Sequence, residues 1–219
     1  GLDRDTRARS ILREHQSGRL DTVRLQRDCL DLAALRNRPV VELVELLGTW
    51  LLDLGVHMPT GKFLKEVASA LSSCRPIGAR SGQLEIKQHR DRLYALKRLP
   101  AVNTEECQLS LGEISIVGGV LINASIEGAG RWQDEYCVRF RKGGESLRQR
   151  RKRTIKNLCQ ESGLPAWLRP RIPLIYKGEE LVAMAALPSW NFPMQIADGY
   201  RAERSEAGFD LALHLNDRF

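Results

Sequence analysis

The sequence has no apolar run long enough to cross a lipid bilayer. A spanning helix needs about 20 consecutive apolar residues, and Glu45, Gly48 and Asp53 interrupt the longest candidate, residues 40–56. We therefore expect no membrane span. The chain begins with Gly1 and carries neither an initiating Met nor a signal peptide, so we expect it to be a piece of a longer protein.

Paired cysteines and clustered histidines are also missing. The chain has five cysteines and no C-x-x-C pair, and its four histidines stand singly, away from one another and from the cysteines. Neither a disulfide framework nor a zinc site is indicated, and we predict no metal ligand. Unpaired cysteines are typical of a reducing compartment, so we expect a cytoplasmic location.

No complete catalytic motif is present. Thr60-Gly61-Lys62 lacks the upstream glycine of a phosphate-binding loop, and no serine or cysteine has an identifiable base. Carboxylates such as Glu161 are too common to be assigned or excluded. We predict no catalytic residue and no cofactor in this stretch of chain, and we interpret Gly143-Gly144 as a bend.

Aromatic residues are scarce, at 6% of the chain, which argues against stacking on unpaired bases as the main activity. Phe140 alternates with polar neighbours and is expected in a core. Trp167 lies beside two leucines; packing is the favoured interpretation, and stacking on a nucleotide is the alternative.

What the sequence does have is a concentration of positive charge. The net charge is +7, and the 18 residues from Arg139 to Lys156 contain nine basic residues and one acid, Glu145. This window alone carries +8, so the remaining 201 residues carry −1. Such a distribution favours an acidic partner.

Phosphates are the partner that this window favours, because neutralising them releases counterions and arginine can hold them bidentately. The densest part is expected in a solvated loop before a helix whose N-terminus would also attract phosphate. A solvated charge run remains the alternative. The candidate RNA-binding residues are Arg139, Arg141, Lys142, Arg148, Arg150, Arg151, Lys152, Arg153, Lys156, Arg169 and Arg171.

The predicted fold class is α+β, with a small helical domain that contains a β-hairpin, residues 1–99, and a β-rich domain, residues 107–219. Hydrophobic spacing predicts helices over residues 4–15 and 40–54 and after the N-cap Thr60. The hairpin strands are expected at 83–87 and 93–97. Residues 100–106 are the candidate linker.

The second domain is predicted mainly from short alternating segments and glycines. Strands are expected at residues 113–117, 120–122, 135–141, 173–176 and 181–184, and along the alternating residues Phe209, Leu211, Leu213 and Leu215. Thr154 is expected to cap a short helix that ends at Ser162, with Gly163 after it.

Several motifs follow one another in this second domain. Arg139-Phe140-Arg141-Lys142-Gly143-Gly144-Glu145 precedes Gln160-Glu161, then Gly163-Leu164-Pro165, Trp167-Leu168-Arg169 and Pro173-Leu174-Ile175-Tyr176-Lys177-Gly178. In this order they resemble the C-terminal domain of bacterial tRNA(Ile)-lysidine synthetase. Ala166 and Pro170 depart from the family's usual pattern. Upstream, Met58-Pro59-Thr60 and the hairpin resemble the family's helical substrate-binding domain.

The resemblance implies an enzyme that uses ATP, with magnesium, to adenylate the wobble cytidine of an isoleucine tRNA and then attach lysine. In that family an N-terminal ATP-pyrophosphatase domain carries a loop of the form S-G-G-x-D-S, which this sequence does not contain. The two C-terminal domains hold the tRNA body, notably the acceptor stem. The implied partners are therefore tRNA(Ile) and the catalytic domain, and homodimer formation is left open.

Two other functions remain alternatives. The chain could be a free-standing basic adaptor for structured RNA without an enzymatic role. It could also be a protein-interaction module whose basic run meets an acidic partner. Selective binding of isoleucine tRNA would favour a synthetase over the adaptor. An RNA-free protein partner in a pull-down would favour the interaction module.

Overall fold

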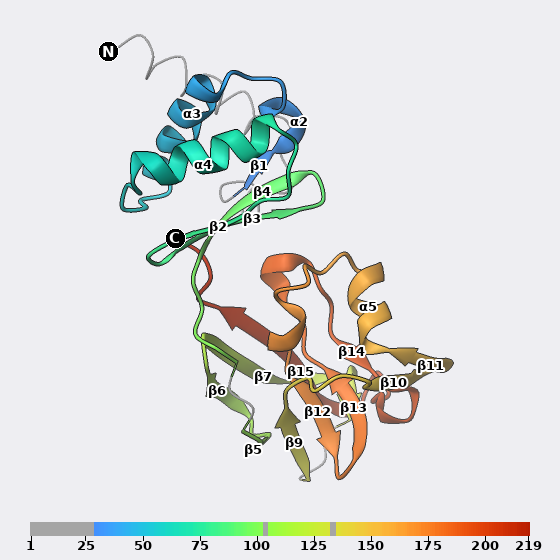
Figure 1. The fold of residues 1–219 in the computed structure, drawn as a ribbon. Coiled ribbons are helices and arrows are strands. Elements are labelled where there is room, and N and C mark those ends of the chain that lie inside the picture. The colour runs from blue at the N-terminus through green and yellow to red at the C-terminus, as the bar shows by residue number, and fades with distance from the viewer. Residues whose placement is uncertain (1–28, 103–104, 132–134) are drawn as a thin grey trace. The chain divides into compact units, whose positions relative to one another are not determined.

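The structure is a computed structural model that describes residues 29–102, 105–131 and 135–219. The chain forms two compact units, each described here by itself: unit 1 comprises the described residues up to Leu99 with Asp217–Phe219, and unit 2 comprises Pro100–Asn216 (Figure 1). The helix predicted at residues 4–15 lies outside the described residues. Within them, four α-helices and 15 strands confirm the α+β class.

Unit 1 is built around two amphipathic helices, α3 (Val40–Asp53) and α4 (Gly61–Ser72), after the short helix α2 (Leu32–Leu35). Leucines at helical spacing in α3 are buried with Trp50, which is 1% exposed. The Thr60 hydroxyl accepts a hydrogen bond from the Phe63 N–H at 3.3 Å and so begins α4. The two predicted helices and the core position of Trp50 are confirmed.

The hairpin of unit 1 is also confirmed, but it is the centre of a larger sheet. Strands β3 (Leu84–His89) and β4 (Arg92–Lys97) pair in register, and β2 (Gly78–Ser81) and β1 (Cys29–Asp31) add to their outer edges. The four-stranded antiparallel order is β1-β4-β3-β2. The two edge strands are three and four residues long, too short to show an alternating pattern in sequence.

The last three residues pack with unit 1, although we placed them in the second domain. The Lys97 N–H donates a hydrogen bond to the Asp217 carbonyl at 2.9 Å, and the Phe219 side chain lies against the unit 1 core. The Lys97 ammonium is 5.6 Å from the centre of the Phe219 ring. The chain thus returns to its first unit after its last strand.

Unit 2 contains two larger antiparallel sheets. The first has the order β14-β13-β12-β9-β5 and the second the order β6-β7-β15-β8. The first sheet consists of β5 (Cys107–Gln108), β9 (Tyr136–Arg139), β12 (Leu174–Lys177), β13 (Glu180–Met184) and β14 (Gln195–Ile196). The second consists of β6 (Gly112–Ile116), β7 (Gly119–Glu127), β8 (Gly130–Arg131) and β15 (Ala207–Leu215).

The first sheet lies between two cores. Val138, Ile175 and Val182 pack against Phe209 and Leu211 of the second sheet. The neighbouring residues on the same strands, among them Leu174 and Leu181, point to the opposite face, where α5 (Ile155–Glu161) covers them. Because successive strand residues alternate in direction, one sheet supplies both cores.

The long strand β15 was predicted from its alternating apolar residues, and Phe209, Leu211 and Leu213 are all fully buried. Its partner β7 is longer than the predicted 120–122, because polar residues as far as Glu127 also pair with β15. Gly208 allows a close crossing here: a Cβ atom at this position would lie 2.1 Å from the Gly128 carbonyl oxygen. Among the described residues, no helix is both long and apolar enough to cross a membrane.

Candidate nucleic-acid interface

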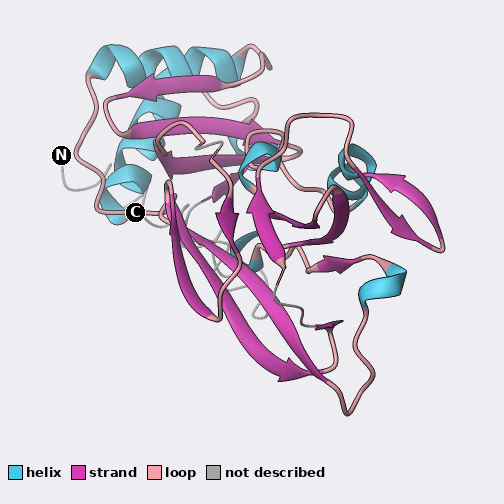
Figure 2. Ribbon diagram, turned by 90° about the horizontal axis from the view of Figure 1, so that it is seen from below, coloured by secondary structure: helices cyan, strands magenta, loops and turns pink. Residues whose placement is uncertain are grey.

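The densest basic residues lie on a two-stranded ribbon and not in the expected loop. Strand β10 (Ser146–Gln149) pairs antiparallel with β11 (Arg151–Thr154), and Arg150 forms the turn between them. Figure 1 shows this ribbon at the edge of unit 2, directly before α5, and Figure 2 shows it extending from the body of the unit. The loop prediction was wrong because a highly charged pair shows little hydrophobic alternation.

Two internal contacts hold the ribbon. At its base, the Leu147 side chain is fully buried and packs in the core with Ile155 and Leu158. At its tip, Arg150 adopts a φ of +35°, and its backbone N–H donates a hydrogen bond to the Asp198 carboxylate. The basic side chains are therefore carried on a backbone that is anchored at both ends.

The helix after the ribbon begins as predicted, but it is short. The Thr154 hydroxyl caps α5 by accepting a hydrogen bond from the Asn157 N–H at 3.2 Å, and Gly163 follows with a φ of +70°. The helix has only seven residues, and the Asn157 N–H at its start already donates to Thr154. The ribbon side chains are therefore the main candidates for binding phosphate.

Each side of the ribbon borders a concave surface. The α5-side groove has a volume of about 750 Å³ and is lined by Gln149, Arg150, Arg151, Lys152, Arg153, Asn157, Glu161, Gln195, Asp198 and Arg201. The β13-side groove has a volume of about 870 Å³ and is lined by Ser146, Arg148, Arg150, Arg151, Lys152, Glu179, Glu180, Leu181, Ala197, Asp198, Gly199 and Tyr200. Arg201, which we did not predict, enters the first groove from a distant part of the chain.

Arg139 lies on β9, lines neither groove and pairs with acidic side chains. Its Nε lies 2.7 Å from Glu106 Oε2, a second nitrogen lies 3.3 Å from Glu179 Oε1, and its guanidinium is 4.8 Å from the centre of the Tyr176 ring. The hydrogen bonds to Arg139 lower the pKa of Glu106, and the same pair raises the pKa of Arg139. Through these contacts Arg139 stabilises the fold of unit 2.

Glu145 organises the bend between β9 and β10. Its carboxylate accepts hydrogen bonds from the backbone N–H groups of Lys142 and Gly143, the latter at 2.6 Å, and lies 3.3 Å from Arg141 Nε. Burial alone would raise its pKa, but these donors outweigh it and lower the pKa. Gly143 and Gly144 have φ angles of +111° and +85°, which confirms the predicted bend.

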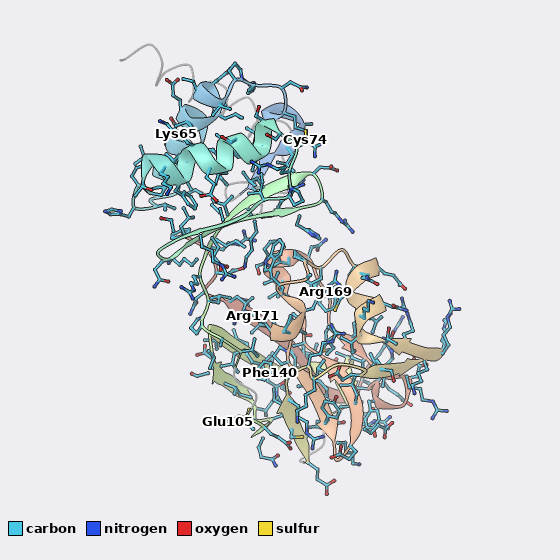
Figure 3. The ribbon with its side chains drawn as sticks, viewed as in Figure 1. Lys65, Cys74, Glu105, Phe140, Arg169 and Arg171 are labelled. Carbon is cyan, nitrogen blue, oxygen red and sulfur yellow. The ribbon has the colours of Figure 1, made fainter. Side chains whose placement is uncertain are left out.

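Arg169 and Arg171, both labelled in Figure 3, lie on the short 3-10 helix η1 (Arg169–Arg171). They line neither groove. Arg169 Nε donates a hydrogen bond to the Leu164 carbonyl at 3.0 Å, and the Arg171 guanidinium donates one to the Pro100 carbonyl. Nearby, Trp167 packs against the core and meets Trp190 edge to face at 6.1 Å between ring centres. This supports the packing interpretation of Trp167.

The structure therefore brings together part of the predicted set. Arg148, Arg150, Arg151, Lys152 and Arg153 share the ribbon, and Lys156 is exposed on the following helix. Arg139, Arg141, Lys142, Arg169 and Arg171 line neither groove. No sequence signal marked Arg201, because it stands 45 residues beyond Lys156, outside the basic window.

The cysteines differ in exposure: Cys74 and Cys107 are exposed and Cys29 is partly buried. Cys137 and Cys159 are buried, and burial is the main cause of their raised thiol pKa values, about 11 for Cys137. In the part of the chain that the structure describes, no cluster of three or more His, Cys, Asp or Glu residues could hold a metal ion. Phe140, labelled in Figure 3, is 9% exposed, so its predicted core position is confirmed.

The fold and the ribbon define a chain of the α+β class whose second unit carries a concentrated basic surface. Residues 137–199 match the family model described as the TilS substrate C-terminal domain. This segment includes the ribbon, α5 and all the lining residues of the two grooves except Arg201 and Tyr200.

The chain is also similar to curated proteins named tRNA(Ile)-lysidine synthase. It is 28% identical to the protein from Coxiella burnetii, over 77% of this chain and 39% of the relative. Identity is 33% with the protein from Serratia proteamaculans, over 63% and 34%, and 30% with that from Pectobacterium atrosepticum, over 75% and 40%. Both comparisons confirm the resemblance to the C-terminal part of this family. The chain spans well under half the length of these relatives.

Proposed function

We propose that this chain is the tRNA-binding part of a tRNA(Ile)-lysidine synthetase. In this proposal its second unit grips the tRNA body, notably the acceptor stem, so that the wobble cytidine reaches a catalytic domain outside these 219 residues. That domain would bind ATP and magnesium and join lysine to the base. The similarity to the synthases named above supports the proposal.

The observation that carries the proposal is the ribbon formed by β10 and β11. Within it, Arg148, Arg150, Arg151 and Lys152 are exposed and Arg153 is partly exposed. Guanidinium groups bind phosphate oxygens in pairs, and a rigid backbone lowers the entropy lost on binding. This is a surface suited to a phosphate backbone.

A titration of the purified chain with isoleucine tRNA at several salt concentrations tests the proposal. If four to six phosphates are neutralised, log affinity should fall with log salt at a slope of roughly −3 to −5. An affinity that does not depend on salt would show that stacking or apolar contact dominates. Preference for isoleucine tRNA over other tRNAs supports the synthetase, whereas equal binding to any structured RNA supports the free-standing adaptor.

The second arm is the triple variant Arg150→Ala, Arg151→Ala and Arg153→Ala. Contacts to phosphate position RNA without reading its bases, so affinity should fall for isoleucine tRNA and other tRNAs alike, with a shallower salt slope. A thermal melt should show little change, roughly 0.5 kcal/mol or less per site, because these side chains project from the ribbon. Unchanged affinity at physiological salt would contradict the assignment of the grip to this ribbon.

A further inference from the structure

The two faces of the ribbon carry different side chains. Partners across an antiparallel pair share a face, and the register pairs Leu147 with Arg153, Arg148 with Lys152 and Gln149 with Arg151. Leu147, Gln149, Arg151 and Arg153 therefore share one face of the ribbon, and Arg148 and Lys152 share the other. Gln149 and Arg153 line only the α5-side groove and Arg148 lines only the β13-side groove, whereas Arg151 and Lys152 line both.

The electrostatic balance differs between the two grooves. The α5-side groove has five basic lining residues against Glu161 and Asp198, a net charge of +3. The β13-side groove has four basic lining residues against Glu179, Glu180 and Asp198, a net charge of +1. A polyanion is therefore attracted more strongly into the first groove.

Much of this difference comes from Arg201. Its side chain is exposed, and its backbone forms an isolated bridge with Gly130, so it is carried by a part of the fold other than the ribbon. It lines the α5-side groove together with the ribbon arginines Arg150, Arg151 and Arg153. Basic groups carried by two parts of the fold can contact one phosphate backbone at more than one point.

The α5-side groove also contains neutral amides suited to RNA. The Gln149 side chain donates a hydrogen bond to the Ile196 carbonyl at 3.1 Å, and its Nε2 lies 3.4 Å from Gln195 Oε1. Asn157, a residue of α5, lines the same groove. Amide groups donate to and accept from ribose 2′-hydroxyls, which distinguish RNA from DNA.

Two carboxylates in this groove pair with groups of the ribbon. Glu161 pairs with the Arg153 guanidinium, and Asp198 accepts a hydrogen bond from the Arg150 backbone N–H. Arg153 and Glu161 side chains are 31% and 60% exposed, so solvent screens the pair and an incoming phosphate can compete for the guanidinium. The groove is thus accessible to an anion.

We propose that the α5-side groove, and not the β13-side groove, holds the RNA backbone, and that Arg201 is a phosphate-binding residue within it. This inference rests on the proposed function, since it specifies where the RNA lies. Arg153 and Arg201 contact phosphates from two different parts of the fold, and Gln149 and Asn157, which line the same groove, contact ribose hydroxyls.

A matched pair of variants tests the inference. Arg201→Gln removes one exposed arginine that lines only the α5-side groove, and Arg148→Gln removes one that lines only the β13-side groove. Both change the net charge equally. We expect Arg201→Gln to weaken tRNA binding roughly fivefold and to reduce the salt slope by about one contact, whereas Arg148→Gln should weaken it clearly less.

Equal losses in the two variants would show that the overall field of the ribbon acts without a preferred face, and a larger loss in Arg148→Gln would place the RNA on the other side. Either result overturns the inference. Arg201→Lys should recover part of the affinity, because it restores the charge, and a thermal melt of each variant checks folding. If the wild-type chain itself does not bind tRNA, the proposed function fails instead.

Discussion

Leu147 and Arg153 are cross-strand partners on one face of the β10–β11 ribbon, yet they have opposite surroundings. Leu147 is fully buried in the core beneath α5, whereas the Arg153 side chain is 31% exposed and pairs with Glu161. On this face, Leu147 therefore packs into the core, while Arg153 next to it lines the α5-side groove. Losing the packing of Leu147 should therefore change the positions of the basic side chains on the ribbon.

Leu147→Ala should destabilise the chain and weaken RNA binding. Removing a fully buried leucine side chain leaves a cavity and typically costs about 2–5 kcal/mol. Denaturant unfolding followed by circular dichroism measures the stability, and tRNA titration measures the binding. Leu111→Ala is the control, because Leu111 is an exposed leucine of the same unit, 56% exposed, and its truncation should change stability by roughly 0.5 kcal/mol or less. Similar losses in both variants would contradict the anchor.

Arg139 should contribute more to folding than to the RNA affinity. Its contacts with Glu106, Glu179 and Tyr176 depend on the planar guanidinium, so Arg139→Gln should lower the melting temperature. Arg139→Lys keeps the charge but loses the two-pronged pair with Glu106. We expect the lysine variant to melt below the wild type and to bind tRNA within roughly twofold of it, since one charge remains. A stable lysine variant with weak binding would identify Arg139 as a direct RNA contact.

Glu145 should make unit 2 sensitive to acid. Its folded pKa is lowered, so its stabilising effect is present above the pKa of the unfolded state and is lost as pH falls through the folded value. Melting curves from neutral pH to below about pH 4, the ordinary range of a glutamate, should therefore show a loss of stability in the wild type. Glu145→Gln should be less stable than the wild type at neutral pH, and the difference should shrink in acid. A constant difference across this range would contradict the role of the ionised carboxylate.

The chain by itself should form no lysidine. With isoleucine tRNA, lysine, ATP and magnesium, we expect no adenylated or lysine-bearing tRNA, because the sequence contains no S-G-G-x-D-S loop. Mass spectrometry of nuclease-digested tRNA provides the measurement. A full-length synthetase, in which the nucleotide-binding loop is present, is the positive control. Product formed by residues 1–219 alone would show that the chemistry lies in these two units.

The amino-acid sequence determined the elements whose pattern is local. Helical spacing and a capping threonine defined α3 and α4, strict alternation defined β15, and Thr154 and Gly163 marked the ends of α5. The order of motifs between Arg139 and Gly178 carried the family resemblance. Each of these signals lies within a short stretch of chain, so neighbouring residues are sufficient to express it.

Tertiary structure decided the elements that side-chain periodicity does not mark. The edge strands β1 and β2, the polar half of β7 and the β10–β11 ribbon form because backbone groups meet partners whose side chains give no periodic signal. Folding also divided the basic residues: Arg139 pairs with Glu106 and Glu179, whereas Arg201 lines a groove together with the ribbon arginines. Charge is visible in a sequence, but whether a charge meets a carboxylate or borders an open groove is determined by contacts between residues that are far apart in the chain.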